Sequence, residues 1–263
     1  MEKQLFGKEN VCGMVFDTET TNCDSKPFCY NVGWTIINGD GEIVVKRDYV
    51  VEQIWHNIPL FSTAYYAEKR PLYVKAMRSR TTKMDKWGYI MGAMCRDIKR
   101  YNVQYAYAYN SPFDDRVFEF NCDYFHTKNP LDTLTLCDIR GFAMSVLEND
   151  NDFKSWCEEN NALTESGNYS TTAENVYRYI MDENEFVEAH TALADSIIEA
   201  HILAWCAESG EDITQPKEAK KALWRNVPKS LTIKVDGEKF AKIGYLRKTV
   251  KGDTIYLSTK TKN

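Results

Sequence analysis

The stretch from Val11 to Thr21 constrains the fold more than any other, because in it an apolar strand sequence ends abruptly in two acids. Side chains alternate between the faces of a strand, so Asp17 and Glu19 should point the same way, with Cα atoms roughly 6 to 7 Å apart. Two carboxylates so close repel each other unless a cation lies between them. The alternative is that both acids are solvated at a frayed strand end. Further acids elsewhere in the chain that could join this pair would favour a cation site.

Charge is distributed unevenly along the 263 residues. Residues 217–263 contain 13 Lys and Arg against 4 Asp and Glu, a net charge of +9, whereas residues 1–216 carry a net charge of −14. We therefore expect an acidic body, residues 1–212, and a small basic β hairpin or meander docked on it, residues 213–263. A basic segment of this kind is suited to binding a polyanion. A surface with no role in binding would have much the same composition, so both interpretations stay open.

The eight cysteines and the N-terminal residues indicate a cytoplasmic protein. The cysteines form no Cys-x-x-Cys pair and mostly lie in apolar segments, which is typical of reduced core thiols and not of disulfides or a zinc site. Residues 1–8 lack the apolar core of a signal peptide, and nowhere do 18 apolar residues run together. We expect neither secretion nor a membrane span.

The hydrophobic pattern predicts an α/β fold in which strands and amphipathic helices alternate. Strand-like runs at 30–37 and 43–51 flank a hairpin turn at 38–41, since Asn-Gly and Asp-Gly accept positive φ. The other expected elements are a helix at 87–98, a strand at 103–110, a helix from 111, a strand at 131–139, a helix to 147, helices at 152–160 and 172–181, the second with a capping box from Thr171 to Glu174, and a helix at 191–207.

A basic and aromatic segment lies between the hairpin and the helix at 87–98. It combines three tyrosines with seven cations, namely Tyr65, Tyr66 and Tyr73 with Lys69, Arg70, Lys75, Arg78, Arg80, Lys83 and Lys86. Aromatic rings beside cations are the composition that proteins use to bind single-stranded nucleic acid. A solvated loop-and-helix surface would have a similar composition, so both interpretations stay open.

Two further acids stand where they could join the first pair. Asp114 follows Ser111 and Pro112 at the start of a helix, so its carboxylate could complete the helix start or be brought to the edge of the sheet. Asp195 lies on an apolar face of the helix at 191–207. An ionised carboxylate there costs several kcal/mol unless something positive meets it. Asp195 is therefore a further candidate oxygen donor.

These four acids form an oxygen-rich set that suits Mg²⁺ or Mn²⁺. Two such ions about 3.5 to 4 Å apart can activate a water and stabilise the leaving oxygen in phosphodiester hydrolysis. His190 precedes the last helix and is free to approach from a loop, where a neutral imidazole could take the proton of that water. The sequence therefore predicts a site for two divalent ions served by a histidine.

Three segments resemble, in order and spacing, the three motifs of the DnaQ-like DEDDh exonucleases of the ribonuclease H-like superfamily: Phe16 to Thr21, Asn110 to Asp114, and His190 to Asp195. The resemblance covers roughly residues 10 to 207. It implies a mixed five-stranded sheet flanked by helices and the 3'-to-5' removal of nucleoside 5'-monophosphates. The arrangement is most similar to stand-alone, phage-type exonucleases, which would place a phage-encoded chain in the host cytoplasm.

The resemblance also implies a role for each site residue. Asp17, Glu19 and Asp195 would hold the catalytic ion, Asp17 would bridge to the second ion, and Asp114 would act through water. The implied metal ligands are thus Asp17, Glu19, Asp114 and Asp195, with His190 as the general base and Thr18, Thr20 and Phe113 lining the pocket of the terminal nucleotide. Asp115 competes with Asp114 for its role, and the spacing in the motif favours Asp114.

Two departures from the family pattern limit what it implies about substrates. Asn22 stands where a glycine often follows the first motif, and the chain before His190 is longer than in compact members. The expected substrate is a single-stranded DNA 3' end. An exoribonuclease similar to oligoribonuclease is the first alternative, and an inactive module that binds nucleic acid or a polymerase is the second.

Overall fold

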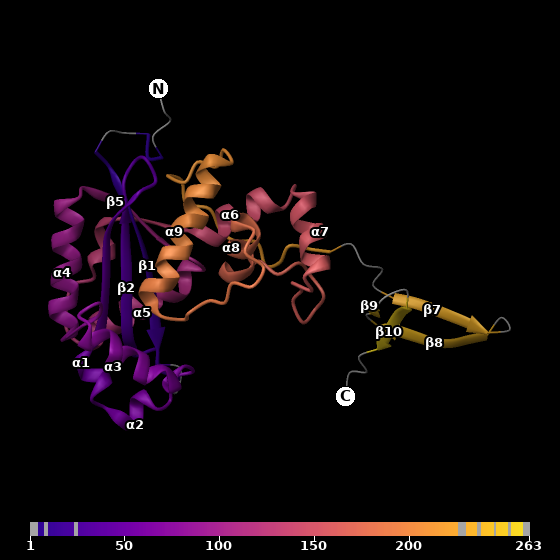
Figure 1. The fold of residues 1–263 in the computed structure, drawn as a ribbon, viewed down its shortest axis with the longest axis horizontal. Coiled ribbons are helices and arrows are strands. Elements are labelled where there is room, and N and C mark those ends of the chain that lie inside the picture. Colours follow the sequence, from indigo (N-terminus) through magenta and orange to yellow (C-terminus); the bar gives the residue numbers. More distant parts are fainter. Residues whose placement is uncertain are drawn as a thin grey trace.

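The computed structural model describes residues 5–7, 10–23 and 26–225 with their side chains, and four later strands by their backbone. At its centre is one sheet with the strand order β4-β3-β2-β1-β5-β6 (Figure 1). The strands are β1 (Cys12–Thr20), β2 (Cys29–Ile37), β3 (Ile43–Val51), β4 (Lys83–Asp85), β5 (Val103–Ala108) and β6 (Thr135–Asp138). Strands β1, β2 and β3 are antiparallel neighbours, whereas the pairs β3/β4, β1/β5 and β5/β6 are parallel. The expected mixed sheet is thus confirmed, with β1 inside it.

The sheet has six strands instead of the five expected, because β4 adds a short strand beside β3. Three residues of β4 pair in parallel with Tyr49, Val50 and Val51. β4 has only three residues, Lys-Met-Asp, which is too short for the pattern of alternating apolar and polar side chains that predicts strands. The expected hairpin between β2 and β3 is present, with Gly41 at φ 82° in its turn.

Helices cover both faces of the sheet. They are α1 (Glu52–Trp55), α2 (Ile58–Phe61), α3 (Arg70–Arg78), α4 (Trp87–Arg100), α5 (Ser111–Tyr124), α6 (Ile139–Leu147), α7 (Asn151–Glu159), α8 (Ala173–Met181) and α9 (Ala192–Glu208), with 3-10 turns η1 (Ala67–Lys69) and η2 (Pro130–Thr133). Figure 1 shows α4 on one side of the sheet and α9 on the other. Short helices α1 to α3 lie in the basic and aromatic segment between the β2/β3 hairpin and α4.

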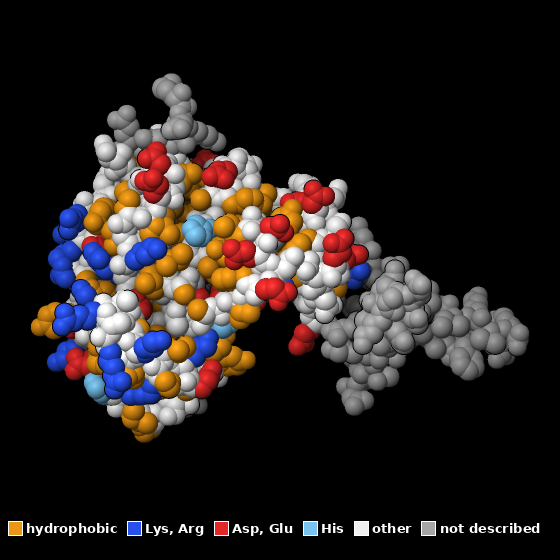
Figure 2. All heavy atoms as spheres, viewed as in Figure 1, with side chains coloured by type: hydrophobic (Ala, Val, Ile, Leu, Met, Phe, Trp, Pro, Cys, Tyr) orange, Lys and Arg blue, Asp and Glu red, His pale blue; other side chains and the backbone are white. Residues whose placement is uncertain are grey.

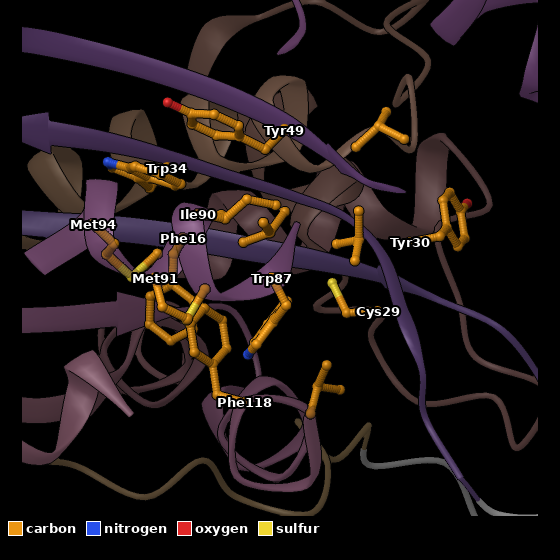
Figure 3. Packing of buried hydrophobic residues seen from close by; sticks show 14 of the residues in the cluster. Phe16, Cys29, Tyr30, Trp34, Tyr49, Trp87, Ile90, Met91, Met94 and Phe118 are labelled. Atoms are coloured by element: carbon orange, nitrogen blue, oxygen red, sulfur yellow. The ribbon is translucent and has the colours of Figure 1, made fainter. Parts of the chain in front are cut away.

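The side chains of β1 point alternately to the two faces of the sheet, and the core accordingly has two clusters, one on each face. Phe16 packs with Trp34, Trp87 and Phe118 against α4 and α5, where Figure 3 shows the aromatic rings meeting the methionines of α4. Val15, its neighbour in sequence, packs in the second cluster with residues of α6, α8 and α9. Asp17 follows two residues after Val15, so it points to the side of α9.

Two expected elements begin at different residues in the structure. The strand expected at 131–139 is shorter, because Asn129 Oδ1 accepts a hydrogen bond from Leu131 N (3.0 Å) and starts the 3-10 turn η2 before β6. The cap of α8 is Thr172, whose hydroxyl accepts from Asn175 N (3.3 Å), one residue later than the predicted capping box. Neighbouring threonines made the cap position ambiguous in the sequence.

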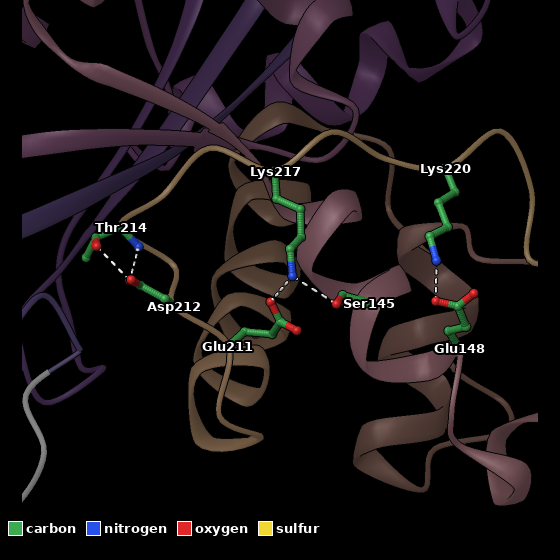
Figure 4. A network of polar contacts seen from close by, with 7 residues as sticks. All are labelled: Ser145, Glu148, Glu211, Asp212, Thr214, Lys217 and Lys220. Atoms are coloured by element: carbon green, nitrogen blue, oxygen red, sulfur yellow. Dashed lines mark hydrogen bonds and ion pairs between the residues drawn. The ribbon is translucent and has the colours of Figure 1, made fainter.

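The segment from 209 to 225 returns over the second cluster. Lys217 Nζ donates to Ser145 Oγ (2.9 Å) on α6 and pairs with Glu211, and Lys220 pairs with Glu148 (Figure 4). Farther along, Leu223 is buried and its carbonyl accepts from Tyr169 N at 3.2 Å. Residues 213–225 therefore pack on the body.

The C-terminal strands form two antiparallel pairs, β7 (Ser230–Val235) with β8 (Glu238–Gly244) and β9 (Leu246–Lys251) with β10 (Thr254–Thr259). The turns predicted at Asp236-Gly237 and Gly252-Asp253 lie outside the described residues. Hairpins are thus present where the sequence predicts them. The division of the chain into two domains remains a prediction.

All eight cysteines are free thiols, as the sequence predicts. Within the part of the chain that the structure describes, no helix is both long enough and apolar enough to cross a membrane.

Candidate functional site

Three acids from distant parts of the sequence meet where β1 ends beside the first turns of α9. One carboxylate oxygen each from Asp17, Glu19 and Asp195 lies within 4.8 Å of the other two. Asp195 and Glu19 retain only 6% and 9% of their exposure, and Asp17 is half-buried. The structure thus brings together the first pair of acids and Asp195, as the sequence predicts.

Strand β2 positions the start of α9, and its residues were not predicted to do so. Asn31 Oδ1 accepts a hydrogen bond from Ala192 N (2.9 Å), the first residue of the helix, whereas the side chain of Thr191 makes no capping bond. Two residues further, Gly33 lies so close to α9 that an added Cβ would be 2.2 Å from Leu193 N. The absence of a side chain at Gly33 therefore allows the helix, and Asp195 with it, to lie against the sheet.

The Asn31 side chain is itself held by four hydrogen bonds. Its Oδ1 also accepts from Tyr73 Oη (3.0 Å), and its Nδ2 donates to Asp48 Oδ1 (2.6 Å) and to the carbonyl of Tyr49 (3.0 Å). Asn31 is fully buried. This network links β2, β3, α3 and α9 next to the acids.

Asp114 reaches the same region from the start of α5. Its Oδ1 accepts hydrogen bonds from the backbone N (3.1 Å) and the hydroxyl (2.6 Å) of Thr18, the residue between Asp17 and Glu19. The turn before α5 is sharp, with Asn110 in the left-handed region at φ 65°. Asp114 is 3% exposed while Asp115 is only partly buried, which supports the choice of Asp114 over its competitor.

Another buried acid, Glu199, was not among the predicted site residues. It lies one helical turn after Asp195 on α9, is 3% exposed, and accepts a hydrogen bond from Tyr109 N (3.2 Å) at the end of β5. This contact ties α9 to the strand that leads into α5. The signal in the sequence was the acid itself, four residues beyond Asp195 on a largely apolar helix.

Burial and mutual repulsion raise the pKa of every carboxyl in this region. Desolvation is the largest cause for each, and it raises the pKa of Glu19 to about 8, of Asp195 to about 8 and of Asp114 to about 7. The pKa of Asp17 is raised well above its usual value by burial and then by the charges of Asp114 and Glu199. The protein alone therefore disfavours the charged form of these groups.

A divalent cation fits this arrangement of donors. Asp195 Oδ1 is buried and has no hydrogen-bond partner. Among the described residues, none of the ion pairs involves Asp17, Glu19 or Asp195. Clustered carboxylate oxygens are the ligands that Mg²⁺ and Mn²⁺ prefer, and a cation would offset the repulsion that raises these pKa values. The acidic cluster can thus hold a divalent ion.

His190 lies just before α9 in a left-handed conformation, at φ 49°. Its ring stacks on Tyr66 with 4.5 Å between centroids and 11° between planes, and its Nδ1 lies 3.6 Å from Glu188 Oε2. Ligand atoms of Glu174, Glu188 and His190 form a second group within 4.8 Å of one another. The structure thus places His190 outside the helix, as predicted, and beside two glutamates that the sequence did not single out.

The three predicted pocket residues lie in different environments. Thr18 is buried and its hydroxyl is directed to Asp114. Thr20 is half-buried at the end of β1, and Phe113 is 37% exposed on the first turn of α5. Their contact with a terminal nucleotide stays a prediction.

Charge on the surface is segregated. Figure 2 shows Lys and Arg side chains gathered over the part of the body that holds α3 and α4, and Asp and Glu side chains around α7 and α8. Five exposed cations follow one another from α3 to the start of α4: Lys75, Arg78, Arg80, Lys83 and Lys86. Arg70, by contrast, stacks on Trp55 at 3.9 Å and donates to its carbonyl at 3.1 Å, so it has a structural role.

Solved structures that are similar to this chain include two exonucleases. The chain is similar to a 3'-exonuclease whose structure describes recognition of the 3' end of the histone mRNA stem-loop, with a TM-score of 0.54 and 11% identity over 77% of this chain. The chain spans 65% of the length of that protein. Escherichia coli exonuclease I in complex with a dA16 oligonucleotide matches at a TM-score of 0.46 and 14% identity, over 73% of this chain and 40% of the other.

The expected class of fold is thereby confirmed: a ribonuclease H-like sheet flanked by helices, as in the 3'-exonuclease. A scan against protein-family models and a search of curated protein sequences give no match. At 11% identity the structural likeness establishes the fold, and the activity has to be argued from the site.

Proposed function

We propose that this chain is a divalent-metal-dependent 3'-to-5' exonuclease that releases nucleoside 5'-monophosphates from single-stranded ends. The observation that carries the proposal is the cluster of Asp17, Glu19 and Asp195, which contains an unpartnered buried oxygen, on the fold of a 3'-exonuclease. Asp114 and His190 complete the set of side chains that the sequence motifs predict.

Each side chain has a task in this proposal. Asp17, Glu19 and Asp195 would hold one ion, and Asp17 with Asp114 would serve a second. When bound, such ions supply a polarised phosphate and a water of lowered pKa. His190 takes the proton of the attacking water, whose oxygen bonds to phosphorus as the bond to the 3' oxygen of the preceding nucleotide breaks. The leaving 3' oxygen takes up a proton from solvent and becomes a hydroxyl. Mg²⁺ and Mn²⁺ are both suited to this all-oxygen set.

Single-stranded DNA is the substrate we propose first, with RNA as a second candidate. The exposed cations from Lys75 to Lys86 offer phosphate contacts that suit either polymer. The RNA candidate is favoured by the structural neighbour, a 3'-exonuclease that recognises a histone mRNA stem-loop.

The decisive experiment uses 5'-labelled single-stranded DNA, single-stranded RNA and duplexes with Mg²⁺ or Mn²⁺, and with a chelator. We expect stepwise shortening from the 3' end that stops in the chelator. Asp114→Asn should abolish it, whereas Asp115→Asn, a matched change at the next and more exposed residue, should not. Binding without shortening would instead indicate an inactive module, and equal activity of Asp114→Asn and wild type would refute the assigned site.

A further inference from the structure

The segment between β3 and α4 reaches across to the loop that carries His190. Lys69 Nζ, at the end of η1, donates a hydrogen bond to the carbonyl of Ala189 (2.6 Å), and it lies 4.2 Å from the centre of the Tyr66 ring. That ring in turn stacks on His190. Two residues of this segment thus hold the carbonyl of Ala189 and the ring of His190, both more than 100 positions away in the sequence.

His190 needs such support because its own conformation is unfavourable. A left-handed backbone costs a residue with a side chain roughly 1 to 2 kcal/mol. Its φ of 49° is nevertheless combined with a half-buried ring packed between Tyr66 and the Glu188 carboxylate. Strain of this kind persists where the surroundings determine the conformation, and it is frequent at functional sites.

The supporting residues also border the acidic cluster. Burial first, and then the charges of Glu19, Tyr65, Glu188 and Asp195, raise the pKa of Tyr66 to about 12. The Lys69 ammonium lowers the pKa of Glu19 and of Asp195. Tyr66 and Lys69 are therefore close enough to interact electrostatically with Glu19 and Asp195, two of the acids that would hold the metal.

We propose that Tyr66, Lys69 and Glu188 are positioning residues that fix the His190 ring beside the acidic cluster. The inference rests on the proposed function and assigns part of the site to a segment outside the three motifs. Glu188 faces Nδ1, so Nε2 is the ring nitrogen left to accept a proton. A base held in place before substrate binds loses less entropy in the reaction.

The charges around His190 also affect its protonation. Burial and the Lys69 ammonium lower the pKa of His190, and the Glu174 carboxylate opposes them. Glu188 and the Tyr66 ring are its other neighbours. Burial is the largest of these effects, so the surroundings favour the neutral imidazole, which is the form that a general base requires.

The test compares Tyr66→Ala, Tyr66→Phe and Lys69→Met with Tyr89→Ala, a control at an exposed tyrosine of α4. Tyr66→Ala should lower kcat about tenfold, part of the 100-fold or more that a general base supplies, with little change in KM. Tyr66→Phe keeps the stacked ring and should keep the activity. Lys69→Met removes a cation beside the imidazole, so the acid limb of the kcat profile should move to higher pH.

NMR titration of the imidazoles gives a readout that needs no activity. The chain has four histidines, and His190→Gln would assign the relevant signal. We expect Tyr66→Ala to shift and broaden that signal and Lys69→Met to raise its titration midpoint. If Tyr66→Ala and Lys69→Met match wild type in kcat, pH profile and this titration, the positioning role is refuted. A wild-type chain that cuts no nucleic acid would refute the proposed function, while the titration still decides whether these residues hold the ring.

Discussion

Replacing Gly33 with alanine tests how closely the site depends on the packing of α9 against β2. An added Cβ would lie 2.2 Å from Leu193 N and 2.4 Å from the carbonyl carbon of Ala192, where ordinary contacts are 3.4 to 4 Å. Both neighbours are backbone atoms, so no side-chain rotation relieves the overlap. The start of the helix must therefore move by about 1.2 Å, and Asp195 in its first turn must move with it.

This shift should be measurable in stability and in catalysis. Overpacking of a dense interior costs about 1 to 3 kcal/mol, which lowers the melting temperature by roughly 3 to 10 °C for a chain of this size. A displacement of about 1 Å in a reacting geometry can reduce the rate 100-fold. We expect Gly33→Ala to lose activity of that order and to bind Mg²⁺ or Mn²⁺ more weakly.

Gly92→Ala is the matched control. Gly92 lies inside α4, and its added Cβ would lie 3.4 Å from the flexible end of Arg96, so alanine should be accepted. It should stabilise the helix by up to about 1 kcal/mol. Melting curves, calorimetric metal binding and exonuclease rates are measured on both variants. If Gly33→Ala melts, binds metal and cuts like wild type, the close approach of α9 to β2 does not position Asp195.

Three further outcomes follow from the described contacts. In the absence of divalent ions, the melting temperature should fall as the pH rises from about 4 to about 8. The reason is that the raised pKa values of Glu19 and Asp195 favour the protonated forms of these groups in the folded state. In a pH series of melting curves, Asp195→Asn should make this fall smaller. Asn31→Ala leaves buried donors on Tyr73 and α9 without an acceptor and should cost about 2 kcal/mol or more in denaturant unfolding. Truncation after Arg225 should keep the body folded and weaken binding to long single strands more than to dinucleotides, with a shallower salt dependence; equal weakening of both would indicate a purely structural tail.

The elements of the central fold could be predicted because their signals are local. An apolar run that ends in Asp17 and Glu19, a hairpin with Asn-Gly and Asp-Gly, and a long apolar helix that contains Asp195 all show in a few neighbouring residues. The strand β4 and the exact start of α8 could not be predicted. β4 is only three residues long, and the start of α8 depends on a choice between adjacent threonines.

The supports of the site were missed because their partners are distant in sequence. Asn31 looks like an ordinary polar residue in a strand until α9 places Ala192 N against it. The pairing of Tyr66 with His190 similarly depends on how the segment after β3 folds back. Such contacts arise from tertiary packing, which no local pattern encodes.

Part of the positive charge of residues 217–263 is used in ion pairs with the body. Lys217, Lys220 and Arg225 all pair with acids of the body, Glu211, Glu148 and Glu158 respectively. Their charge is thus partly neutralised at the surface of the body. Any binding of a polyanion by the C-terminal segment would therefore depend mainly on its cations beyond residue 225.

The order of the ligands along the chain has a consequence for biosynthesis. Strand β1 leaves the ribosome before α9, which brings Asp195 and is the last of the described helices to be made. A nascent or prematurely terminated polypeptide has only part of the acidic cluster and lacks the helix that covers β1 and β2. The complete acidic cluster can therefore form only after nearly the whole body has been synthesised.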